Sequence, residues 1–97
     1  MIQIDQAAIG HILNSSTEEK QVLKCIEEMS ELQKELCRYL EDGIGSFVLE
    51  EMADVLITIE QMKIIFGINE DSLNSMIGYK IGRTLSRFEK REENNNG

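Results

Sequence analysis

The sequence predicts an all-α protein, and three observations support this prediction. The chain of 97 residues contains no proline and has only two tyrosines and three phenylalanines. Leu, Ile, Met, Glu, Lys and Gln are abundant, and these residues favour helices. Hydrophobic residues recur at intervals of three and four, which is the period of an amphipathic helix. The expected fold is a compact helical bundle of three long helices and a short N-terminal helix.

The first predicted helix is short and runs from Gln6 to Leu13, with Asp5 placed to cap its N-terminus. The residues that follow it break the pattern and fit a capping box, which is typical of a helix start. Two pairs could form this box, Ser15 with Glu18 and Ser16 with Glu19. A second helix is therefore expected to begin here.

The second predicted helix runs to about Leu40 and carries an amphipathic stripe. The stripe consists of Val22, Cys25, Ile26, Met29, Leu32, Leu36 and Leu40. Gly43 and Gly45 end the helix and leave only a short loop before the next one. Cys25 and Cys37 would lie about 18 Å apart along one helix. They are therefore expected to be small core residues without a disulfide.

The third predicted helix is almost entirely apolar. Ser46 can cap it, it runs to about Phe66, and Gly67 is a natural C-terminal stop. From Phe47 to Phe66, 13 of 20 residues are apolar, so the helix is expected to be buried on most sides. Asp54 lies within this apolar stretch, and a buried carboxylate is costly unless it is paired or bound to a metal.

The fourth predicted helix begins after a capping Asn69 and runs from Glu70 to about Arg91. The tail at 92–97 is polar and is expected to be frayed. Neither a repeat nor an internal boundary is visible, so residues 1–91 are predicted to form a single domain. A chain of this length buries a modest share of its surface alone. We therefore expect it to assemble into a homo-oligomeric bundle.

The net charge of −8 argues against binding to a nucleic-acid polymer or to an anionic membrane, because both need basic surfaces. The charge is also unevenly distributed, since residues 1–71 hold 15 acidic and 5 basic side chains while residues 72–97 hold 3 and 5. The sequence shows no signal peptide and no apolar stretch of membrane-spanning length. We therefore expect a cytoplasmic protein.

Two pairs of acidic residues indicate a metal site. Glu28 and Glu31 on the second helix are three residues apart, and Glu51 and Asp54 repeat this spacing on the third. If the two helices pack antiparallel through the short glycine loop, four carboxylates can converge. Hard cations such as Mg²⁺ or Mn²⁺ prefer oxygen ligands of this kind. The alternative is an ordinary solvated acidic face, which is common for one such pair and less common for two.

A basic stripe on the fourth helix complements these acids. Lys80, Arg83 and Arg87 fall on one helical face. Opposite an acidic metal site, such residues could bind the phosphates of a polyphosphate substrate. Alternatively, they could neutralise acids on neighbouring helices.

The acidic motif resembles the signature of the MazG-like all-α nucleoside triphosphate pyrophosphohydrolases. The motif reads E-E-x-x-E at 27–31, followed after nineteen residues by E-x-x-D at 51–54. The wider superfamily includes dimeric dUTPases and phosphoribosyl-ATP pyrophosphohydrolases. The resemblance extends from about Glu18 to Arg91 and includes the helix EEMADVLITIEQM and the closing K-x-x-R-x-x-x-R at 80–87.

The resemblance implies a Mg²⁺-dependent hydrolase, with Mn²⁺ as a substitute, that converts a nucleoside triphosphate to the monophosphate and pyrophosphate. The implied metal ligands are Glu28, Glu31, Glu51 and Asp54. Glu27 would help to orient the attacking water, and Lys80, Arg83 and Arg87 would bind phosphates. Such an enzyme would serve nucleotide-pool housekeeping, and the resemblance also implies assembly as a homodimer or homotetramer.

Two other interpretations remain open. The chain could be a non-catalytic helical interaction or regulatory protein that has kept the bundle and lost turnover. It could also hydrolyse a specialised nucleotide such as phosphoribosyl-ATP. Retention of four mutually repelling carboxylates argues against the first of these.

Overall fold

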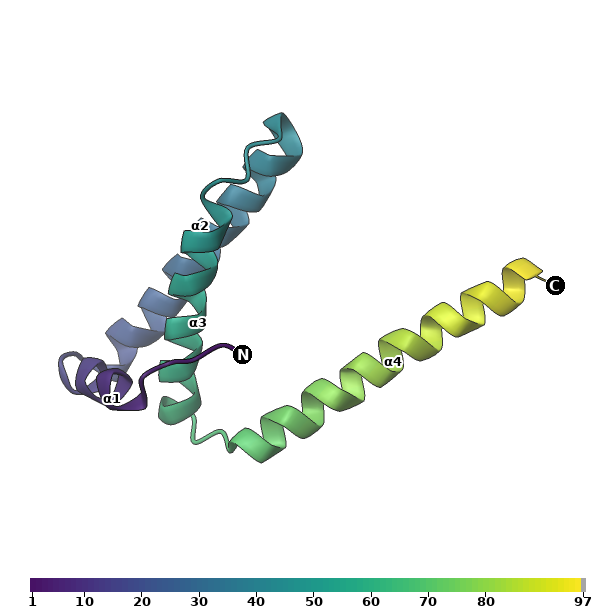
Figure 1. Cartoon of the computed structure of the whole chain (residues 1–97). Helices are drawn as coiled ribbons and strands as arrows, with labels where there is room; N and C mark the ends of the chain where they lie inside the picture. Colours follow the sequence, from purple (N-terminus) through teal and green to yellow (C-terminus); the bar gives the residue numbers. More distant parts are fainter. Residues whose placement is uncertain (97) are drawn as a thin grey trace. The chain divides into compact units, whose positions relative to one another are not determined.

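The computed structural model describes residues 1–96, with side chains up to residue 94, and all its regular elements in this range are helices (Figure 1). The predicted all-α fold, with three long helices and one short N-terminal helix, is confirmed. The helices are α1 (Gln6–Asn14), α2 (Glu18–Asp42), α3 (Val48–Ile65) and α4 (Glu70–Asn96). Across residues 1–96, no helix combines the length and the apolar character needed to traverse a bilayer.

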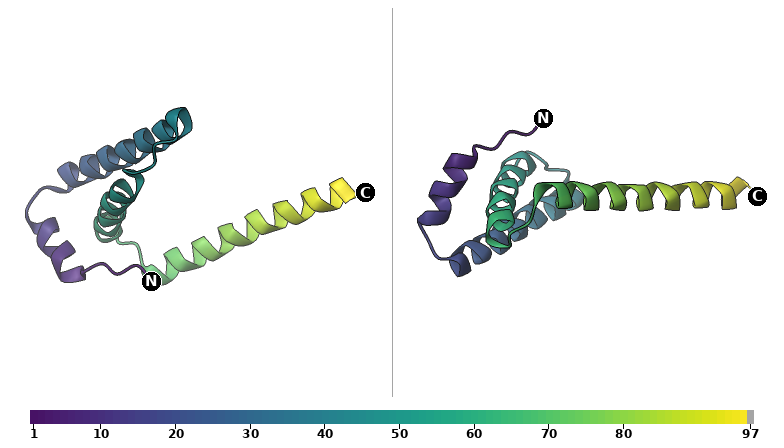
Figure 2. Two further views of the ribbon diagram at one scale, coloured as in Figure 1. Left: turned by 45° about the horizontal axis from the view of Figure 1, so that its top comes forward. Right: turned by 90° about the horizontal axis from the view of Figure 1, so that it is seen from below.

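The helices belong to two compact units. The N-terminal unit, Met1–Gly67, contains α1, α2 and α3, and the C-terminal unit begins at Ile68 and contains α4. Within the N-terminal unit, α2 and α3 lie side by side in each view (Figure 2). A single helix has no core of its own, so the division into units is no sign of a second folded domain. The single domain over residues 1–91 stays a prediction.

The helix starts follow the sequence closely, with one shift. Asp5 caps α1 as predicted, because its side chain accepts hydrogen bonds from the backbone N–H groups of residues 7 and 8. The cap of α2 is Thr17 and neither predicted serine, since the Thr17 Oγ1 accepts from the Lys20 N–H at 3.2 Å. The Ser15 hydroxyl instead donates to the Ile12 carbonyl at 2.6 Å and closes the end of α1.

The connection between α2 and α3 corrects a second predicted cap. Gly43 has a φ of 74°, a left-handed conformation that glycine adopts without strain, and it ends α2 as expected. Ser46, the predicted cap of α3, does not serve as one. The chain instead enters α3 through a turn in which the Val48 N–H donates to the Gly45 carbonyl at 3.2 Å, and Phe47 occupies the cap position.

The fourth helix begins as predicted and ends later. The Asn69 side chain accepts hydrogen bonds from the N–H groups of Asp71 and Ser72 and caps α4. The helix continues to Asn96, so the expected end at Arg91 is wrong, and most of the tail predicted to be frayed is helical. No proline or glycine interrupts residues 92–96, and nothing in their composition forces the helix to stop.

The seam between α2 and α3 is polar. Gln21 near the start of α2 bonds with Gln61 near the end of α3, whereas Arg38 near the end of α2 lies over the ring of Phe47 at the start of α3. The two helices are therefore antiparallel. The buried residues of this seam include Gln21, Glu35, Thr58 and Gln61. The two hydrophobic residues counted as buried among the described side chains are Ile9 and Cys25.

Gln21 joins all three helices of the N-terminal unit. Its Nε2 donates to the carbonyls of Leu13 and Ser16 at 2.8 and 3.1 Å, and its Oε1 accepts from the Gln61 Nε2 at 3.2 Å. Both amide hydrogens and the amide oxygen of Gln21 are thereby used. Since Gln21 and Gln61 are each only 4% exposed, these bonds replace water that the amides have lost.

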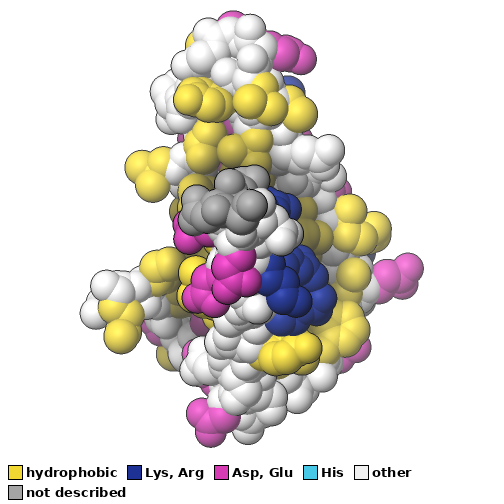
Figure 3. Space-filling view, turned by 90° about the vertical axis from the view of Figure 1, so that its right-hand side faces the viewer, with side chains coloured by type: hydrophobic (Ala, Val, Ile, Leu, Met, Phe, Trp, Pro, Cys, Tyr) yellow, Lys and Arg dark blue, Asp and Glu magenta, His cyan; other side chains and the backbone are white. Residues whose placement is uncertain are grey.

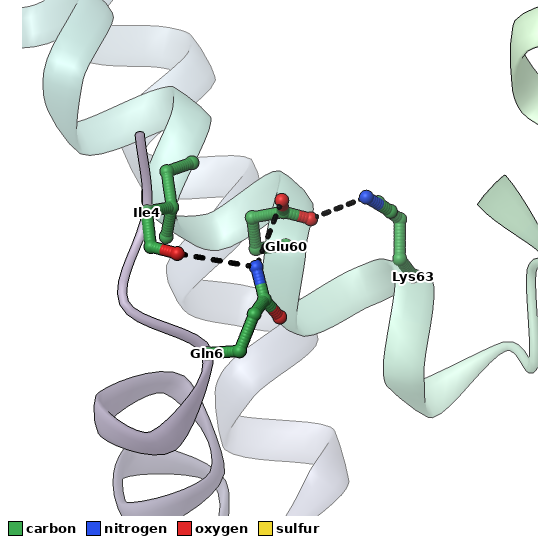
Figure 4. Close-up of polar contacts among 4 residues, drawn as sticks. All are labelled: Ile4, Gln6, Glu60 and Lys63. Carbon is green, nitrogen blue, oxygen red and sulfur yellow. Dashed lines mark hydrogen bonds and ion pairs between the residues drawn. The ribbon is translucent and has the colours of Figure 1, made fainter. Parts of the chain in front are cut away.

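A second polar connection fixes the start of α1 on α3 (Figure 4). Gln6 Nε2 donates to the Glu60 Oε1 at 3.3 Å and to the Ile4 carbonyl at 3.4 Å. Glu60 also pairs with Lys63 through its other oxygen at 2.6 Å. The short helix α1 is therefore tied at its first residue to α3 and at its last turn to α2.

Apolar side chains lie outside this polar seam. Met52 and Ile59 on α3 and Phe66 directly after it follow one another at seven-residue intervals and are 48%, 36% and 63% exposed. The prediction that α3 is buried on most sides is therefore wrong within this chain, because its polar side faces α2. Cys37, expected in the core, is also exposed, and both cysteines are free as predicted. Hydrophobic side chains are visible over much of the surface in Figure 3.

Replacement of Gln21 by alanine is expected to lower the free energy of unfolding by about 1–3 kcal/mol, because the buried Gln61 amide and the carbonyls of Leu13 and Ser16 lose their hydrogen bonds to Gln21. Urea unfolding followed by circular dichroism measures this change. Gln33→Ala is the matched control, since Gln33 is exposed on the same helix. Equal losses in the two variants would show that the amide bonds of Gln21 do not stabilise the fold.

Candidate metal centre

The antiparallel register of α2 and α3 brings three predicted metal ligands together. Glu28 projects from α2, and Glu51 and Asp54 project from α3, one turn apart. Each offers a carboxylate oxygen, and the three oxygens lie within 4.8 Å of one another. The Glu28 side chain is 12% exposed, and Glu51 and Asp54 are half-buried. We call these three residues the acidic cluster.

The spacing of the acidic cluster fits a divalent cation. Oxygen ligands lie about 2.1 Å from Mg²⁺ and about 2.3–2.6 Å from Ca²⁺, so two ligands on opposite sides are about 4–5 Å apart. The separations within the cluster do not exceed this range. All three donors are carboxylate oxygens, which suit Mg²⁺ and Mn²⁺ and suit softer metals poorly. The residues present therefore fit the ion that the sequence predicts.

Mutual repulsion is visible at Glu51. Partial removal of its carboxylate from water raises its pKa above the ordinary value, and Asp54 and Glu28 raise it further. Smaller contributions come from Glu31 and Glu50. Each effect disfavours the charged form of Glu51, so the cluster is a place where a positive charge is needed.

One cation of the protein already reaches the acidic cluster. The Lys24 Nζ lies 2.8 Å from the Glu28 Oε1, four residues along α2. This hydrogen bond and the charge of Glu28 raise the pKa of Lys24, and Glu27 and Asp54 add smaller contributions. Lys24 is therefore charged at neutral pH and partly neutralises the cluster.

Two other predicted acids lie outside the acidic cluster. Glu31, predicted as the fourth metal ligand, is exposed and is not among the three converging residues, although its charge acts on Glu51. Glu27, predicted to orient the attacking water, is exposed and acts on Lys24. The roles of Glu27 and Glu31 stay predictions.

The predicted phosphate-binding residues form their own group on α4. Lys80, Arg83 and Arg87 line one hollow of about 240 Å³, together with Thr84. The Arg83 guanidinium also lies over the ring of Tyr79, 5.9 Å from its centroid. These residues belong to the C-terminal unit, and their role opposite the acidic cluster stays a prediction.

A larger hollow of about 390 Å³ adjoins the acidic cluster within the N-terminal unit. Glu28 and Asp54 of the cluster form part of its wall. The rest comes from the end of α1, the first turns of α2 and the second half of α3, and includes Lys20, Lys24, Gln21, Thr58 and Gln61. Its volume lies within the range of small-molecule sites, about 300–1,000 Å³.

Sequence reasoning missed Lys24, the Gln21–Gln61 pair and Glu35. The spacing of Lys24 and Glu28 at i and i+4 was a usable signal for an ion pair. Glu35 continues the face of Glu28 and is 8% exposed, with Arg38 at 3.6 Å from its Oε2. The burial of Glu35 and the pairing of Gln21 with Gln61 both depend on the packing of α3, so the sequence pattern of α2 alone does not indicate them.

Neither family models, nor curated proteins, nor solved structures give a match to this chain. The functional inference therefore rests on the residues and geometry described above.

Removal of one charge from the acidic cluster is expected to stabilise the metal-free protein. A carboxyl group whose folded-state pKa is raised contributes stability below its unfolded pKa and loses this contribution as the pH rises through the folded value. At pH 7 without divalent cations, Glu51→Gln should therefore melt at a higher temperature than the wild type. The difference should shrink as the pH falls toward about 4.5, where the Glu51 carboxyl takes up a proton in both states.

Thermal melts at several pH values in a chelating buffer measure this effect. Glu50→Gln should have a smaller effect than Glu51→Gln, because Glu50 is exposed and makes the smallest of the named contributions to the raised pKa of Glu51. Added Mn²⁺ should stabilise the wild type more than Glu51→Gln. A difference between wild type and Glu51→Gln that is the same at pH 5 and pH 7 would contradict the proposed repulsion.

Proposed function

We propose that the protein is a Mg²⁺-dependent nucleoside triphosphate pyrophosphohydrolase that releases a nucleoside monophosphate and pyrophosphate. The observation that carries this proposal is the convergence of Glu28, Glu51 and Asp54 from two antiparallel helices. Three carboxylates at this spacing, beside a hollow of about 390 Å³, provide a cation site next to room for a substrate. The resemblance of the two-part acidic motif to the MazG-like family supports the same activity.

The residues would act mainly by positioning and charge. Bound Mg²⁺ would supply neutralisation of the triphosphate charge and activation of the attacking water. Glu28, Glu51 and Asp54 would hold the ion, with Glu31 as the fourth predicted ligand and Glu27 orienting the water. Attack at the α-phosphorus breaks its bond to the bridging oxygen, and pyrophosphate leaves. Lys80, Arg83 and Arg87 would bind phosphate oxygens.

We also propose that the chain assembles as a homodimer or homotetramer. The apolar residues Met52, Ile59 and Phe66 form an exposed stripe at heptad spacing along α3 and directly after it. Met29, Leu36 and Leu40 of the amphipathic stripe on α2 are exposed as well. Apolar surface of this extent in a small chain is typical of a protein–protein interface.

Incubation with Mg²⁺ and a panel of ribo- and deoxyribonucleoside triphosphates is expected to yield pyrophosphate and the monophosphate. Asp54→Asn should lower kcat/KM on the order of 100-fold or more, because it removes one negative ligand of the cation. Asp42→Asn makes the same change at the end of α2, outside the cluster, and should retain activity. Separate assays of pyrophosphate and orthophosphate measure the products. Release of orthophosphate alone, or of neither product, would refute the proposed reaction.

Glu31→Gln tests the fourth predicted ligand. A loss of activity as large as that of Asp54→Asn is expected if Glu31 joins the other three carboxylates when the ion binds. Full activity of Glu31→Gln would assign the ion to Glu28, Glu51 and Asp54 alone. That outcome would leave the proposed reaction of the wild type unchanged and would remove only Glu31 from the ligand set.

A charged residue in the α3 stripe is expected to weaken the assembly. Ile59→Glu and Met52→Glu each place a carboxylate where an apolar contact is proposed, and desolvation of that charge opposes association. Sedimentation velocity should show a shift toward the monomer for both variants. Met52→Leu keeps the apolar character and should behave as the wild type. A wild type that is monomeric at tens of micromolar would falsify the proposed oligomer.

A further inference from the structure

Lys24 lies between two features of the N-terminal unit. Its ammonium is 2.8 Å from the Glu28 Oε1 of the acidic cluster, and its side chain also lines the adjoining hollow of about 390 Å³. Lys20, one helical turn earlier on α2, lines the same hollow. Among the described residues, these two lysines are the only basic side chains in its wall.

The pair between Lys24 and Glu28 is poorly suited to a purely structural role. The Lys24 side chain is 60% exposed, and exposed pairs of this kind stabilise a helix weakly. The partner, by contrast, is 12% exposed and belongs to the candidate metal site. The exposed Lys24 ammonium is therefore hydrogen-bonded to the Glu28 Oε1, a carboxylate oxygen that a bound metal ion would need as a ligand.

The local charge balance indicates what replaces Lys24. Three carboxylates and one ammonium leave two negative charges at the acidic cluster when all four groups are ionised. A divalent cation that takes the place of the ammonium would leave the cluster with one negative charge instead of two, and its bonds to carboxylate oxygens are stronger than a solvated ion pair. Lys24 would then be displaced from Glu28 while its stem remained anchored on α2, at the edge of the hollow.

We propose that Lys24 is an exchangeable counter-ion and phosphate-binding residue, which pairs with Glu28 in the metal-free protein and turns to a phosphate oxygen of the nucleotide when the metal ion binds. This inference rests on the proposed function, because it takes a metal-bound nucleotide as the ligand. The nucleoside occupies the hollow, and its phosphates extend toward the acidic cluster. Lys24 thus provides a phosphate-binding cation in the same unit as the metal ligands.

The choice of Lys24 over an arginine fits this exchange. Lysine is a compact point charge on a flexible stem, whereas a planar arginine forms two parallel bonds with a carboxylate and leaves it less readily. The ammonium has three donors and no acceptor, so it can serve a carboxylate or a phosphate but offers nothing to the metal ion. The Lys24 ammonium therefore binds either the Glu28 carboxylate or a phosphate oxygen, and it does not bind both at once.

The proposed exchange predicts that Lys24→Gln changes the affinities for the metal ion and for the nucleotide in opposite directions. Lys24→Gln should bind Mn²⁺ alone more tightly, by about 2- to 5-fold, because the ion no longer competes with the ammonium for Glu28. In the presence of saturating Mn²⁺, the same variant should bind a non-hydrolysable nucleoside triphosphate analogue about 10- to 100-fold more weakly. If Lys24 only supported the fold, its substitution would weaken the binding of both Mn²⁺ and the analogue.

Electron paramagnetic resonance of free Mn²⁺ measures the first affinity, and calorimetric titration with the analogue measures the second. Lys34→Gln is the matched control, since it removes the same charge about 15 Å further along α2 and should change neither affinity. Lys24→Arg keeps the positive charge but should bind Mn²⁺ more weakly than the wild type, because an arginine leaves the Glu28 carboxylate less readily. Circular dichroism melts confirm that each variant is folded.

Two results would overturn the role of Lys24, namely unchanged or weaker Mn²⁺ binding by Lys24→Gln, or unchanged binding of the analogue. These results are distinguishable from failure of the proposed function. If the proposed function were wrong, the wild type itself would bind neither Mn²⁺ nor the analogue and would release no pyrophosphate. Wild-type activity combined with an unaffected Lys24→Gln would reject the counter-ion exchange alone.

Discussion

The polar seam between α2 and α3 is the constraint on which the rest of this structure depends. Two helices that met only through apolar residues could slide by one turn at small cost, whereas buried amides must meet their partners. Gln21 uses both amide hydrogens and its oxygen, and a shift of α3 would leave Gln61 without its bond. The same register sets Glu28 against Glu51 and Asp54. The fold thus specifies the acidic cluster through contacts made two helical turns away from it.

A polar seam has a consequence for the apolar residues. Each helix has one side turned to its neighbour, and on α3 that side holds Asp54, Thr58 and Gln61. The stripe of Met52, Ile59 and Phe66 is left partly exposed, so much of its apolar surface is not buried by folding of the N-terminal unit alone. Burial of apolar surface is the main favourable term in folding. Further packing of these residues, which we assign to a second copy of the chain, would therefore stabilise the seam that holds the acids together.

Much of the helical structure could be predicted from the sequence because its signals are local. Asp5, Asn69 and Gly43 act within one turn of their own positions, and each is confirmed. The missed caps show the limit of this reasoning, since Thr17 and its neighbouring serines are chemically alike and only the path of the chain selects one. Glu28, Glu51 and Asp54 could be found because acids within apolar patterns stand out. Gln21 and Glu35 could not, because their burial depends on the register of α3, which no local pattern encodes.

The surroundings of the acidic cluster indicate more about its ligand than the negative charge of the cluster does. An acidic site that needed only neutralisation could have received it from the protein, and Arg38 and Lys63 do pair with Glu35 and Glu60 elsewhere in the N-terminal unit. At the acidic cluster, Lys24, whose side chain is 60% exposed, pairs with Glu28, one of the three carboxylates. Partial removal from water raises the pKa of Glu51, and the charges of Asp54 and Glu28 raise it further, so a positive charge at this cluster would be favourable. A site left in this condition beside a hollow with its own lysines is better suited to a cation that arrives with an anionic substrate than to a permanent structural ion. This combination is the basis on which we propose phosphate chemistry for the two helices.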